Sequence, residues 1–345
     1  MKKLYKLLCI CGLAITSSLS HAATTAETGR IFVQHQGVIA HSYAPADMAK
    51  AIEVAAEGDT LLLANGTYPS QFTIGKSISI IGADATYINC QGNTACITLK
   101  SATTDSLKVH LENLNTTSSN GLRIELYNAM ENGTYYSLTH PVRLSLYKSR
   151  ILEVRTSEGN MAKVNSFFDR CIVSYQTGLR HPAQATFNNS EILNLGECDN
   201  IRANHCHIMS IRSIDNSLII NSIIEDISSK DYDNNEGPSS TVIANSLYHT
   251  TDQVYALQNC SASKETLLKT TFPFTCKYTR DQLASNNYLG TDGTVIGIFG
   301  GSVPSNVTDA ASLIAPTNRP KITNQSVDWD ESKTKVKVNA KVTVK

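Results

Sequence analysis

Apolar residues occur along most of the chain in short runs. After residue 59 these runs are four to six residues long and are separated by Asn, Gly, Ser and Asp, as in residues 60–63, 78–81, 96–99 and 109–114. Runs of this length predict β-strands. No helical pattern separates them, although parallel strands of an ordinary sheet need a helical crossover. The pattern therefore predicts either antiparallel hairpins or a coil with three strands in each turn.

One stretch ahead of these strands has the period of an amphipathic helix. It covers residues 45–57, with Pro45 in its first turn and Gly58 directly after its end, as is typical of helix boundaries. The apolar residues on its one face are Met48, Ile52, Ala55 and Ala56. No other stretch has a convincing helical pattern.

A polar position recurs between two apolar stretches in seven segments of the chain. Successive positions are 20, 20, 15, 17, 24 and 14 residues apart, and five of the seven are asparagine. Stacked strands lie about 4.8 Å apart, so asparagines at one corner of successive turns can exchange amide hydrogen bonds. Asparagine also tolerates the left-handed backbone of a sharp corner, although it is common in any β-turn. The predicted ladder is Ser149, Asp169, Asn189, Asn204, Asn221, Asn245 and Asn259.

Residues 51–68, followed by residues 78–83, resemble the opening of the pectin-lyase-like β-helix superfamily. The resemblance implies that the amphipathic helix caps the open end of a coil and that Gly58 and Asp59 lead into the first turn. Together with the ladder it predicts an all-β fold, a right-handed single-stranded parallel β-helix with an N-terminal amphipathic capping helix. The superfamily contains lyases, hydrolases, adhesins and phage fibres, so the resemblance leaves the chemistry open.

The first residues have the layout of a cleavable secretory signal. Lys2, Lys3 and Lys6 precede an apolar run, and Ala22 stands at the expected cleavage site. The run is too short to span a bilayer, as is every later segment. We therefore expect a secreted, periplasmic or cell-surface protein with no transmembrane segment. The predicted divisions are a signal peptide (1–22), an N-terminal segment with the capping helix (23–57), the parallel β-helix (58–290), and a closing segment with an edge strand (291–345).

The predicted closing segment has two distinctive parts. Residues 292–301 are similar to a closing segment of exported β-helix proteins of unassigned function. Residues 335–345 alternate between small apolar residues on one face and mostly lysines on the other, which predicts a single edge strand that lysines protect and that packs back on the coil.

Charge and cysteine content narrow the picture further. The formal net charge is zero, which gives no reason to expect a nucleic-acid partner. Cys90 and Cys96 flank a short polar turn and are the first choice for a disulfide in an exported chain. Cys260 with Cys276 is the second choice. The other cysteines after the signal are expected to be small buried apolar residues: Cys171, Cys198 and Cys206.

Two Asp-Asn pairs supply the candidate catalytic residues. Asp199 and Asp215 are sixteen residues apart, about one turn of the predicted coil. Two stacked carboxylates would bind Ca²⁺ or share a proton, and Arg212 and His205 are close to them in the sequence. A turn explains both Asp-Asn pairs without further assumptions, and it is the alternative to a site.

Arginines near the ladder suggest a weaker ligand-binding stripe. Arg150 and Arg170 are assigned to the position after the ladder, and an anion between two stacked arginines would offset their repulsion. The alternative is a solvated outer face on which these arginines pair with Glu153 or Glu191.

Metal ligands and sugar-stacking aromatics have limited support. Asp231 and Asp233 offer oxygen atoms at alternate positions, as calcium loops do, but the loop lacks the full spacing, so a solvated loop is the alternative. His205 and His207 have the spacing of a zinc pair without an identifiable third ligand. A sugar-stacking shelf, with ordinary packing as its alternative, would consist of Tyr135 and Tyr136 together with Tyr147 or Tyr175.

No motif of the superfamily's enzymes is complete in this chain. The Gly-His-Gly of its hydrolases and the Arg-x-Pro-x-x-Arg of its calcium lyases are both missing. The first functional hypothesis is an exported β-helix that binds a polysaccharide or cell-surface glycan, or serves surface or matrix interaction. The second is a polysaccharide lyase or glycoside hydrolase that acts on an acidic polysaccharide. Whether the protein is an enzyme, and whether it uses calcium, stays open at this point.

Overall fold

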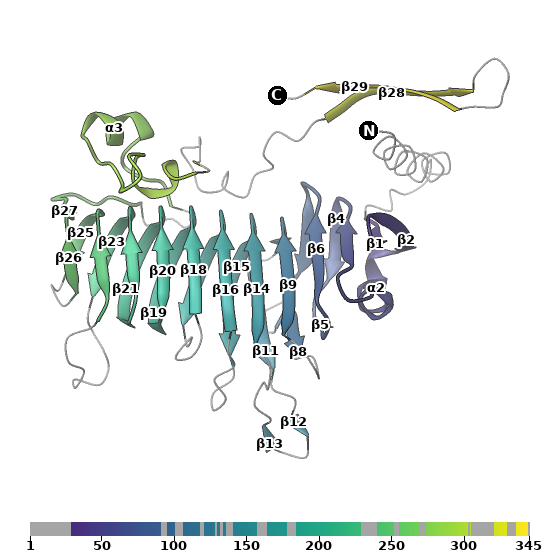
Figure 1. Cartoon of the computed structure of the whole chain (residues 1–345), viewed down its shortest axis with the longest axis horizontal. Coiled ribbons are helices and arrows are strands. Elements are labelled where there is room, and N and C mark those ends of the chain that lie inside the picture. Colours follow the sequence, from purple (N-terminus) through teal and green to yellow (C-terminus); the bar gives the residue numbers. More distant parts are fainter. Residues whose placement is uncertain are drawn as a thin grey trace.

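The computed structural model is a parallel β-helix, with its coils stacked along the long axis of the molecule (Figure 1). The predicted fold class is therefore confirmed. The predicted signal peptide lies outside the described residues. The structure describes residues 29–90, 95–100, 106–117, 121–127, 130–131, 134–135, 141–156, 164–177, 184–228, 240–251, 255–269, 274–302, 304, 321–329 and 336–343.

A twelve-stranded sheet, here called the long sheet, forms one wall of the coil. All its strands from β3 onward pair in parallel. In order, it contains β2 (Val38–Tyr43), β1 (Ile31–His35), β3 (Thr60–Leu63), β6 (Ile78–Gly82), β9 (Leu107–Glu112), β14 (Val142–Tyr147), β16 (Val164–Asp169), β18 (Gln184–Asn188), β20 (Ile201–Asn204), β22 (Leu218–Ile220), β24 (Val242–Ala244) and β26 (Ala256–Gln258).

A ten-stranded sheet forms the opposite wall. It contains β5 (Phe72–Ile74), β8 (Ile97–Lys100), β11 (Leu122–Tyr127), β15 (Arg150–Thr156), β17 (Ile172–Thr177), β19 (Glu191–Asp199), β21 (His207–Asp215), β23 (Ile223–Ser228), β25 (Leu247–Thr251) and β27 (Ser261–Ala262). A three-stranded sheet joins the two walls in the first coils only, with β4 (Gly66–Pro69), β7 (Thr86–Asn89) and β10 (Asn115–Thr116). Among the residues that the structure describes, the expected three strands per turn therefore occur only in these first coils.

The later coils turn between the two walls within two residues. Lys148 and Ser149, for example, connect β14 to β15, and Lys148 has a φ of 45°. A single left-handed residue reverses the chain direction so sharply that no third strand is needed. Inside the walls, alternate side chains of each strand form one apolar core, as in the burial of Leu107, Val109 and Leu111 along β9.

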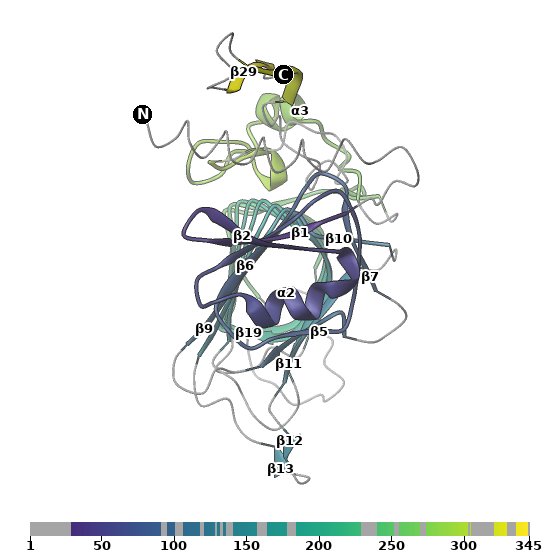
Figure 2. The same cartoon turned by 90° about the vertical axis from the view of Figure 1, so that its right-hand side faces the viewer.

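The capping helix covers the first coil, as the resemblance implied (Figure 2). It consists of a 3₁₀ turn, η1 (Pro45–Asp47), and α2 (Met48–Val54). Its buried residues include Met48, Ala51 and Ile52, whereas Ala56, which we expected on the buried face, is exposed. The helix ends at Val54 instead of Glu57 because Ala55 is extended and the Asp59 carboxylate accepts the backbone N–H of Ala56 at 2.8 Å.

A β-hairpin that the sequence analysis missed lies beside this helix. Strands β1 and β2 pair antiparallel with each other, and β1 pairs antiparallel with β3. The hairpin thus covers the exposed hydrogen-bonding edge of the first parallel strand, which would otherwise be free to pair with other chains.

The predicted ladder is wrong by one residue at three of its positions. Residues with positive φ hold the corners, and successive corners are linked by backbone hydrogen bonds such as Asn189 N to Asn204 O at 3.1 Å. Ser149, Asp169 and Asn204 are each adjacent to the true corner residue. The observed column is Asn113, Lys148, Arg170, Asn189, His205, Asn221, Asn245 and Asn259. Which residue occupies the corner is set by the backbone conformation, and the identity of the side chain does not fix it.

From Lys148 onward, the position after each corner forms a second column of serine and cysteine, which is buried at every member except the half-buried Cys260. The Ser222 hydroxyl donates to Ile220 O at 2.7 Å and accepts the backbone N–H of Cys206 at 3.2 Å. Such a small polar side chain satisfies backbone groups that the tight corner leaves without strand partners. The members of this column are Ser149, Cys171, Ser190, Cys206, Ser222, Ser246 and Cys260.

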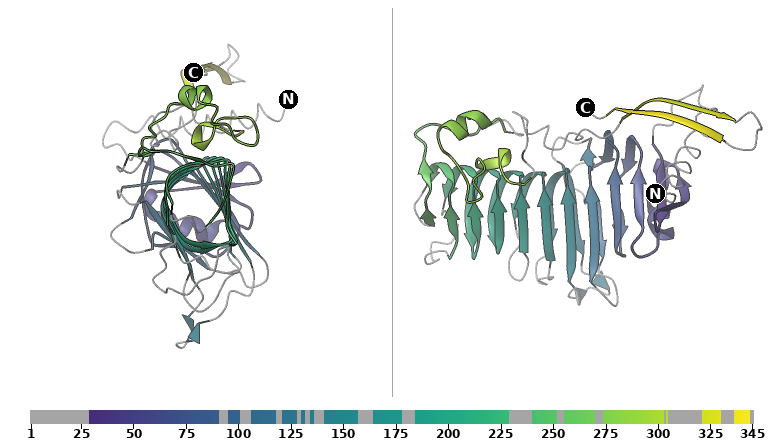
Figure 3. Two further views of the ribbon diagram at one scale, coloured as in Figure 1. Left: turned by 90° about the vertical axis from the view of Figure 1, so that its left-hand side faces the viewer. Right: turned by 45° about the horizontal axis from the view of Figure 1, so that its top comes forward.

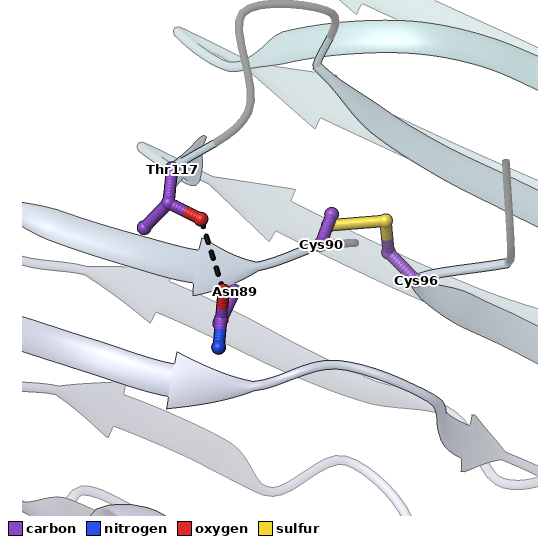
Figure 4. Close-up of a disulfide and its surroundings, with 4 residues drawn as sticks. All are labelled: Asn89, Cys90, Cys96 and Thr117. Atoms are coloured by element: carbon purple, nitrogen blue, oxygen red, sulfur yellow. Dashed lines mark hydrogen bonds between the residues drawn. A yellow bond between two sulfur atoms is a disulfide. The ribbon is translucent and has the colours of Figure 1, made fainter. Parts of the chain in front are cut away.

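The cysteines are distributed accordingly. Cys90 and Cys96 form a disulfide near the end of β7, beside a 3.1 Å hydrogen bond between Thr117 and Asn89 (Figure 4). Cys260 and Cys276 are free thiols, so the second expected pair is wrong. Cys260 belongs to the serine-cysteine column, which holds its sulfur within reach of Ile243 O. Cys171, Cys198 and Cys206 are buried and free, as expected.

The chain leaves the coil after β27, well before residue 290, and residues 263–269 and 274–302 form a lobe that packs on the outside of the coil (Figure 3). This C-terminal lobe contains α3 (Arg280–Ser285) and η2 (Gly297–Phe299). A second apolar cluster joins it to the coil. Its buried members are Ile223, Leu247, Leu267, Leu268, Phe274, Leu283, Val295, Ile296, Ile298 and Phe299.

The predicted single edge strand near the C-terminus is instead half of a hairpin. Strands β28 (Lys321–Trp329) and β29 (Val336–Thr343) pair antiparallel as a separate two-stranded sheet. A short hairpin, β12 (Met130–Glu131) with β13 (Thr134–Tyr135), lies between β11 and β14. Within the described residues, no helix has the length and apolar character to cross a membrane.

Candidate functional site

Asp199 and Asp215 occupy equivalent positions on adjacent coils. They are directly paired in the register of β19 and β21, so their sixteen-residue spacing does correspond to one coil. The residues that follow them, Asn200 and Asn216, have φ values of 58° and 46° and are joined by a side-chain hydrogen bond. Left-handed asparagines at a strand end are what a tight turn requires.

The carboxylate of Asp215 already has internal hydrogen-bond partners. Its Oδ1 accepts from the backbone N–H groups of Asn216 and Ser240 and from the Ser240 hydroxyl, each at 2.8 Å. These bonds hold the turn between β21 and β22 against the start of the next coil. The turn interpretation therefore accounts for the Asp215 geometry.

His205, another of the candidate catalytic residues, lies away from this pair. His205 precedes β21 and Asp215 ends it, so the two lie at opposite ends of a nine-residue strand. His205 is 1% exposed and lies 3.0 Å from Asp292 of the C-terminal lobe. Arg212 is exposed, with its Nε 3.2 Å from the Ser210 hydroxyl. The short sequence distance from His205 to Asp215 is thus misleading, because a full strand separates them.

Arg150 and Arg170 are not stacked on each other. Arg150 is aligned with Ile172, whereas Arg170 holds a corner and its guanidinium binds Asp169 at 2.8 and 2.9 Å. Burial lowers the pKa of Arg150, and the nearby Glu191 opposes this shift. The one-residue error in the ladder produced the false stack.

The expected metal ligands find no support among the residues that the structure describes. Asp231 and Asp233 lie outside them. In the described part of the chain, no group of three or more His, Cys, Asp or Glu side chains is arranged to hold a metal ion.

Three ring-bearing side chains gather on the outside of the long sheet. His110, Tyr147 and Phe167 come from the adjacent strands β9, β14 and β16, at positions that alternate with core residues. The ring centroids of Tyr147 lie 5.0 Å from His110 and 5.6 Å from Phe167. All three side chains are half-buried. We call this cluster the aromatic face.

Charged and amide groups surround the aromatic face. Tyr147 is aligned with Glu112 on one neighbouring strand and with Asp169 on the other. Burial raises the pKa of Tyr147, Asp169 and Glu112 raise it further, and Arg170 opposes them. The phenol is therefore a hydrogen-bond donor at neutral pH.

A row of exposed polar residues runs alongside. Lys108, Arg143, Asn165 and Gln184 follow one another on β9, β14, β16 and β18 in direct register. Each coil therefore presents one polar side chain beside the rings, at the spacing of parallel strands, about 4.8 Å.

Sequence analysis selected Tyr147 but missed His110 and Phe167. The available signal was the alternation in residues 107–111 and 142–146, which have apolar residues at every second position, and in residues 164–168, where the small Ser166 stands between the apolar Val164 and Phe168. Aligning these strands by their apolar positions would have brought the intervening residues onto one outer face. Tyr136 lies outside the described residues.

Comparisons with known proteins give little further guidance. No family model matches the chain, and no curated protein matches it. Among solved structures, the chain is similar to the pectin methylesterase from Aspergillus niger in deglycosylated form, with 14% identity and a TM-score of 0.25 over 63% of this chain and 81% of that one. A likeness at this level carries no argument about activity.

Proposed function

We propose that this protein binds a glycan along the aromatic face of the long sheet. The observation that supports the proposal is the contact of His110, Tyr147 and Phe167 on the outside of three adjacent strands. Half-buried rings offer apolar surface for the C–H faces of sugars at low entropic cost. The amides and charges in register beside them would bind sugar hydroxyl and carboxylate groups.

We also propose a superfamily and a cellular location for the protein. We infer an exported member of the pectin-lyase-like β-helix superfamily that acts in the periplasm, at the cell surface or outside the cell. The signal-like first residues and the helix-capped coil support this inference.

Glycan binding is testable on the aromatic face directly. Affinity electrophoresis and calorimetry against acidic and neutral polysaccharides should reveal a ligand, and Tyr147→Ala and Phe167→Ala should each weaken its binding by roughly tenfold. Tyr87→Ala is the matched control, because Tyr87 is an exposed tyrosine (40%) on β7 of the three-stranded sheet. An equal loss in the control, or no ligand for the unchanged protein, would contradict the proposal.

A second candidate function is cleavage of an acidic polysaccharide. The observation in its favour is that Glu112 and Asp169 lie on either side of Tyr147, so that carboxylates and a phenol share one surface. Release of reducing ends or of unsaturated uronides from a bound polysaccharide would support it. Asp169→Asn would then abolish release while leaving the affinity of the aromatic face within a few-fold of its original value. If the protein binds the polysaccharide but releases no cleavage product, only the glycan-binding function is supported.

A further inference from the structure

A groove of about 680 Å³ opens between β25 and the C-terminal lobe, away from the aromatic face. Its walls include His249 of the coil and Lys264, Glu265, Lys269 and Lys277 of the lobe. Ligand pockets commonly have volumes of roughly 300–1,000 Å³. The groove therefore has the size of a small-ligand site. It lies on a different surface from the aromatic face.

Hydrogen bonds to a buried carboxylate hold the base of the groove. Leu267 and Leu268 are buried, and their backbone N–H groups donate to one carboxylate oxygen of Glu225 at 2.7 and 2.8 Å. The other oxygen of Glu225 lies 4.0 Å from His249 Nε2. The Glu225 carboxylate beneath the groove is thus hydrogen-bonded by donors of the protein itself, and it and Glu191 act electrostatically on Cys276 of the groove wall.

The mouth of the groove carries an excess of positive charge. Lys264, Lys269 and Lys277 are exposed there, and Glu265 is the one carboxylate among the residues that line it. Lys277 forms an ion pair with Glu265. An anionic ligand would compete with Glu265 for Lys277 and would meet the two other ammonium groups directly.

The remaining titratable group of the groove is neutral. Burial raises the pKa of the Cys276 thiol to about 12, so it adds no negative charge at physiological pH. At the exposed mouth, three ammonium groups therefore outnumber the single carboxylate of Glu265, which makes the potential there positive.

We propose that this groove binds the anionic groups, carboxylate or sulfate, of an acidic glycan. The proposal is independent of the aromatic face, since the two surfaces share no residue. It gives the protein a second contact through which an acidic glycan is distinguished from a neutral one.

The test uses the full chain, with trigalacturonate and a sulfated disaccharide as acidic probes, maltotriose as the neutral probe and inorganic sulfate as a free oxyanion. Calorimetry or ligand-observed NMR at low salt should show binding of the acidic sugars, which weakens as salt is added. Maltotriose should not bind. Equal affinity for inorganic sulfate would assign the groove to a free oxyanion and overturn the proposal, as would equal binding of maltotriose.

Four variants locate the binding. Lys277→Gln and Lys269→Gln should each weaken it by about three- to tenfold. Glu265→Gln should strengthen it about threefold, because it releases Lys277. Lys50→Gln is the control, since Lys50 is an exposed lysine of the capping helix. Thermal unfolding of each variant shows whether it is folded.

Two results would contradict the assignment to this groove. One is an equal loss in the Lys50 variant, and the other is weaker binding in the Glu265 variant. Tyr147→Ala should leave the affinity for the short acidic probes unchanged, so that failure of the groove proposal and failure of the aromatic-face proposal are distinguishable.

Discussion

The imidazole Nε2 of His205 lies 3.0 Å from the carboxylate of Asp292, which joins a corner of the coil to the C-terminal lobe across 87 positions of sequence. His205 is buried at this contact, whereas the Asp292 side chain is 41% exposed. The same junction includes Asn189, whose amide donates to Gly300 O at 2.7 Å, and Asn221, whose Oδ1 accepts the Thr291 N–H at 2.9 Å. Three corners of the coil thus hold one segment of the lobe.

Acid should loosen this junction. Burial alone would raise the pKa of Asp292, but its hydrogen bonds with Thr294 and the neighbouring His205 lower it overall. A lowered pKa means that the contribution of Asp292 is present above the ordinary carboxylate range near pH 4 and is lost as pH falls through the folded-state value. Hydrogen exchange of residues 287–301 should therefore accelerate below about pH 4. In Asp292→Asn this acceleration should be smaller, whereas Asp84→Asn, an exposed control, should behave as the unchanged protein.

His207 should make the whole fold sensitive to mild acid. It is fully buried against Phe299, with centroids 5.4 Å apart, and burial lowers its pKa from 6.5 to about 3. The unfolded chain then binds more protons between these values, so stability falls by up to about 1.4 kcal/mol per pH unit as pH decreases through that window. Neither ring nitrogen has a hydrogen-bond partner among the described residues.

Replacing this histidine tests the explanation. His207→Leu should flatten the pH dependence of the urea midpoint between pH 6 and pH 4, because no buried base is left to titrate. His41→Leu, on the exposed strand β2, should retain the original slope. A slope unchanged in His207→Leu would show that other groups cause the acid sensitivity.

Gly300 should tolerate no side chain. A Cβ atom at this position would lie 1.6 Å from Val295 O and 2.6 Å from His205 Nδ1, and the first of these is backbone. Gly300→Ala should therefore cost about 2 kcal/mol or more and separate the lobe from the coil. Limited proteolysis would detect this as new cleavage within residues 287–301. Gly75→Ala is the control, because its Cβ would meet only Lys100 O at 3.9 Å, and cleavage in that variant would count against the steric explanation.

The buried serine-cysteine column should accept cysteine but not alanine. Ser222→Ala removes the acceptor of the Cys206 N–H and the donor to Ile220 O, and leaving such buried groups unpaired costs roughly 1–3 kcal/mol. Ser222→Cys should cost less, since cysteine already occupies equivalent corners at Cys171 and Cys206. Chemical unfolding of the two variants would decide this. A cysteine variant as unstable as the alanine variant would show that the hydroxyl itself is required.

Local sequence patterns predicted the length of a single coil correctly but not which residue holds each corner. The spacing of Asp199 and Asp215 gave the length of one coil, and their register in adjacent strands agrees with it. The corner column was assigned one residue away at Asn204, because several polar residues adjoin each corner and only backbone φ identifies the left-handed one. The one-residue errors at Ser149 and Asp169, which run in opposite directions, produced the false stack of Arg150 on Arg170.

The residues of the aromatic face and of the lobe junction could not be identified from local sequence patterns alone. His110, Tyr147 and Phe167 become neighbours only through the exact alignment of three strands, which buried side chains of all three determine together. The contact between His205 and Asp292 has no local signal, since neither residue interrupts the pattern of its own segment.

The amino-acid sequence by itself determined that this chain forms short strands after an amphipathic helix, because alternation, turn residues and an amphipathic stretch are properties of short segments. The recurring polar position and the resemblance of residues 51–68 and 78–83 then indicated a helix-capped parallel coil. Tertiary structure alone decided which polar residues are buried under the lobe and which lie exposed beside aromatic rings. The reason is physical: strand register and lobe docking depend on the packing of residues that are far apart in the chain, and no local segment contains that information.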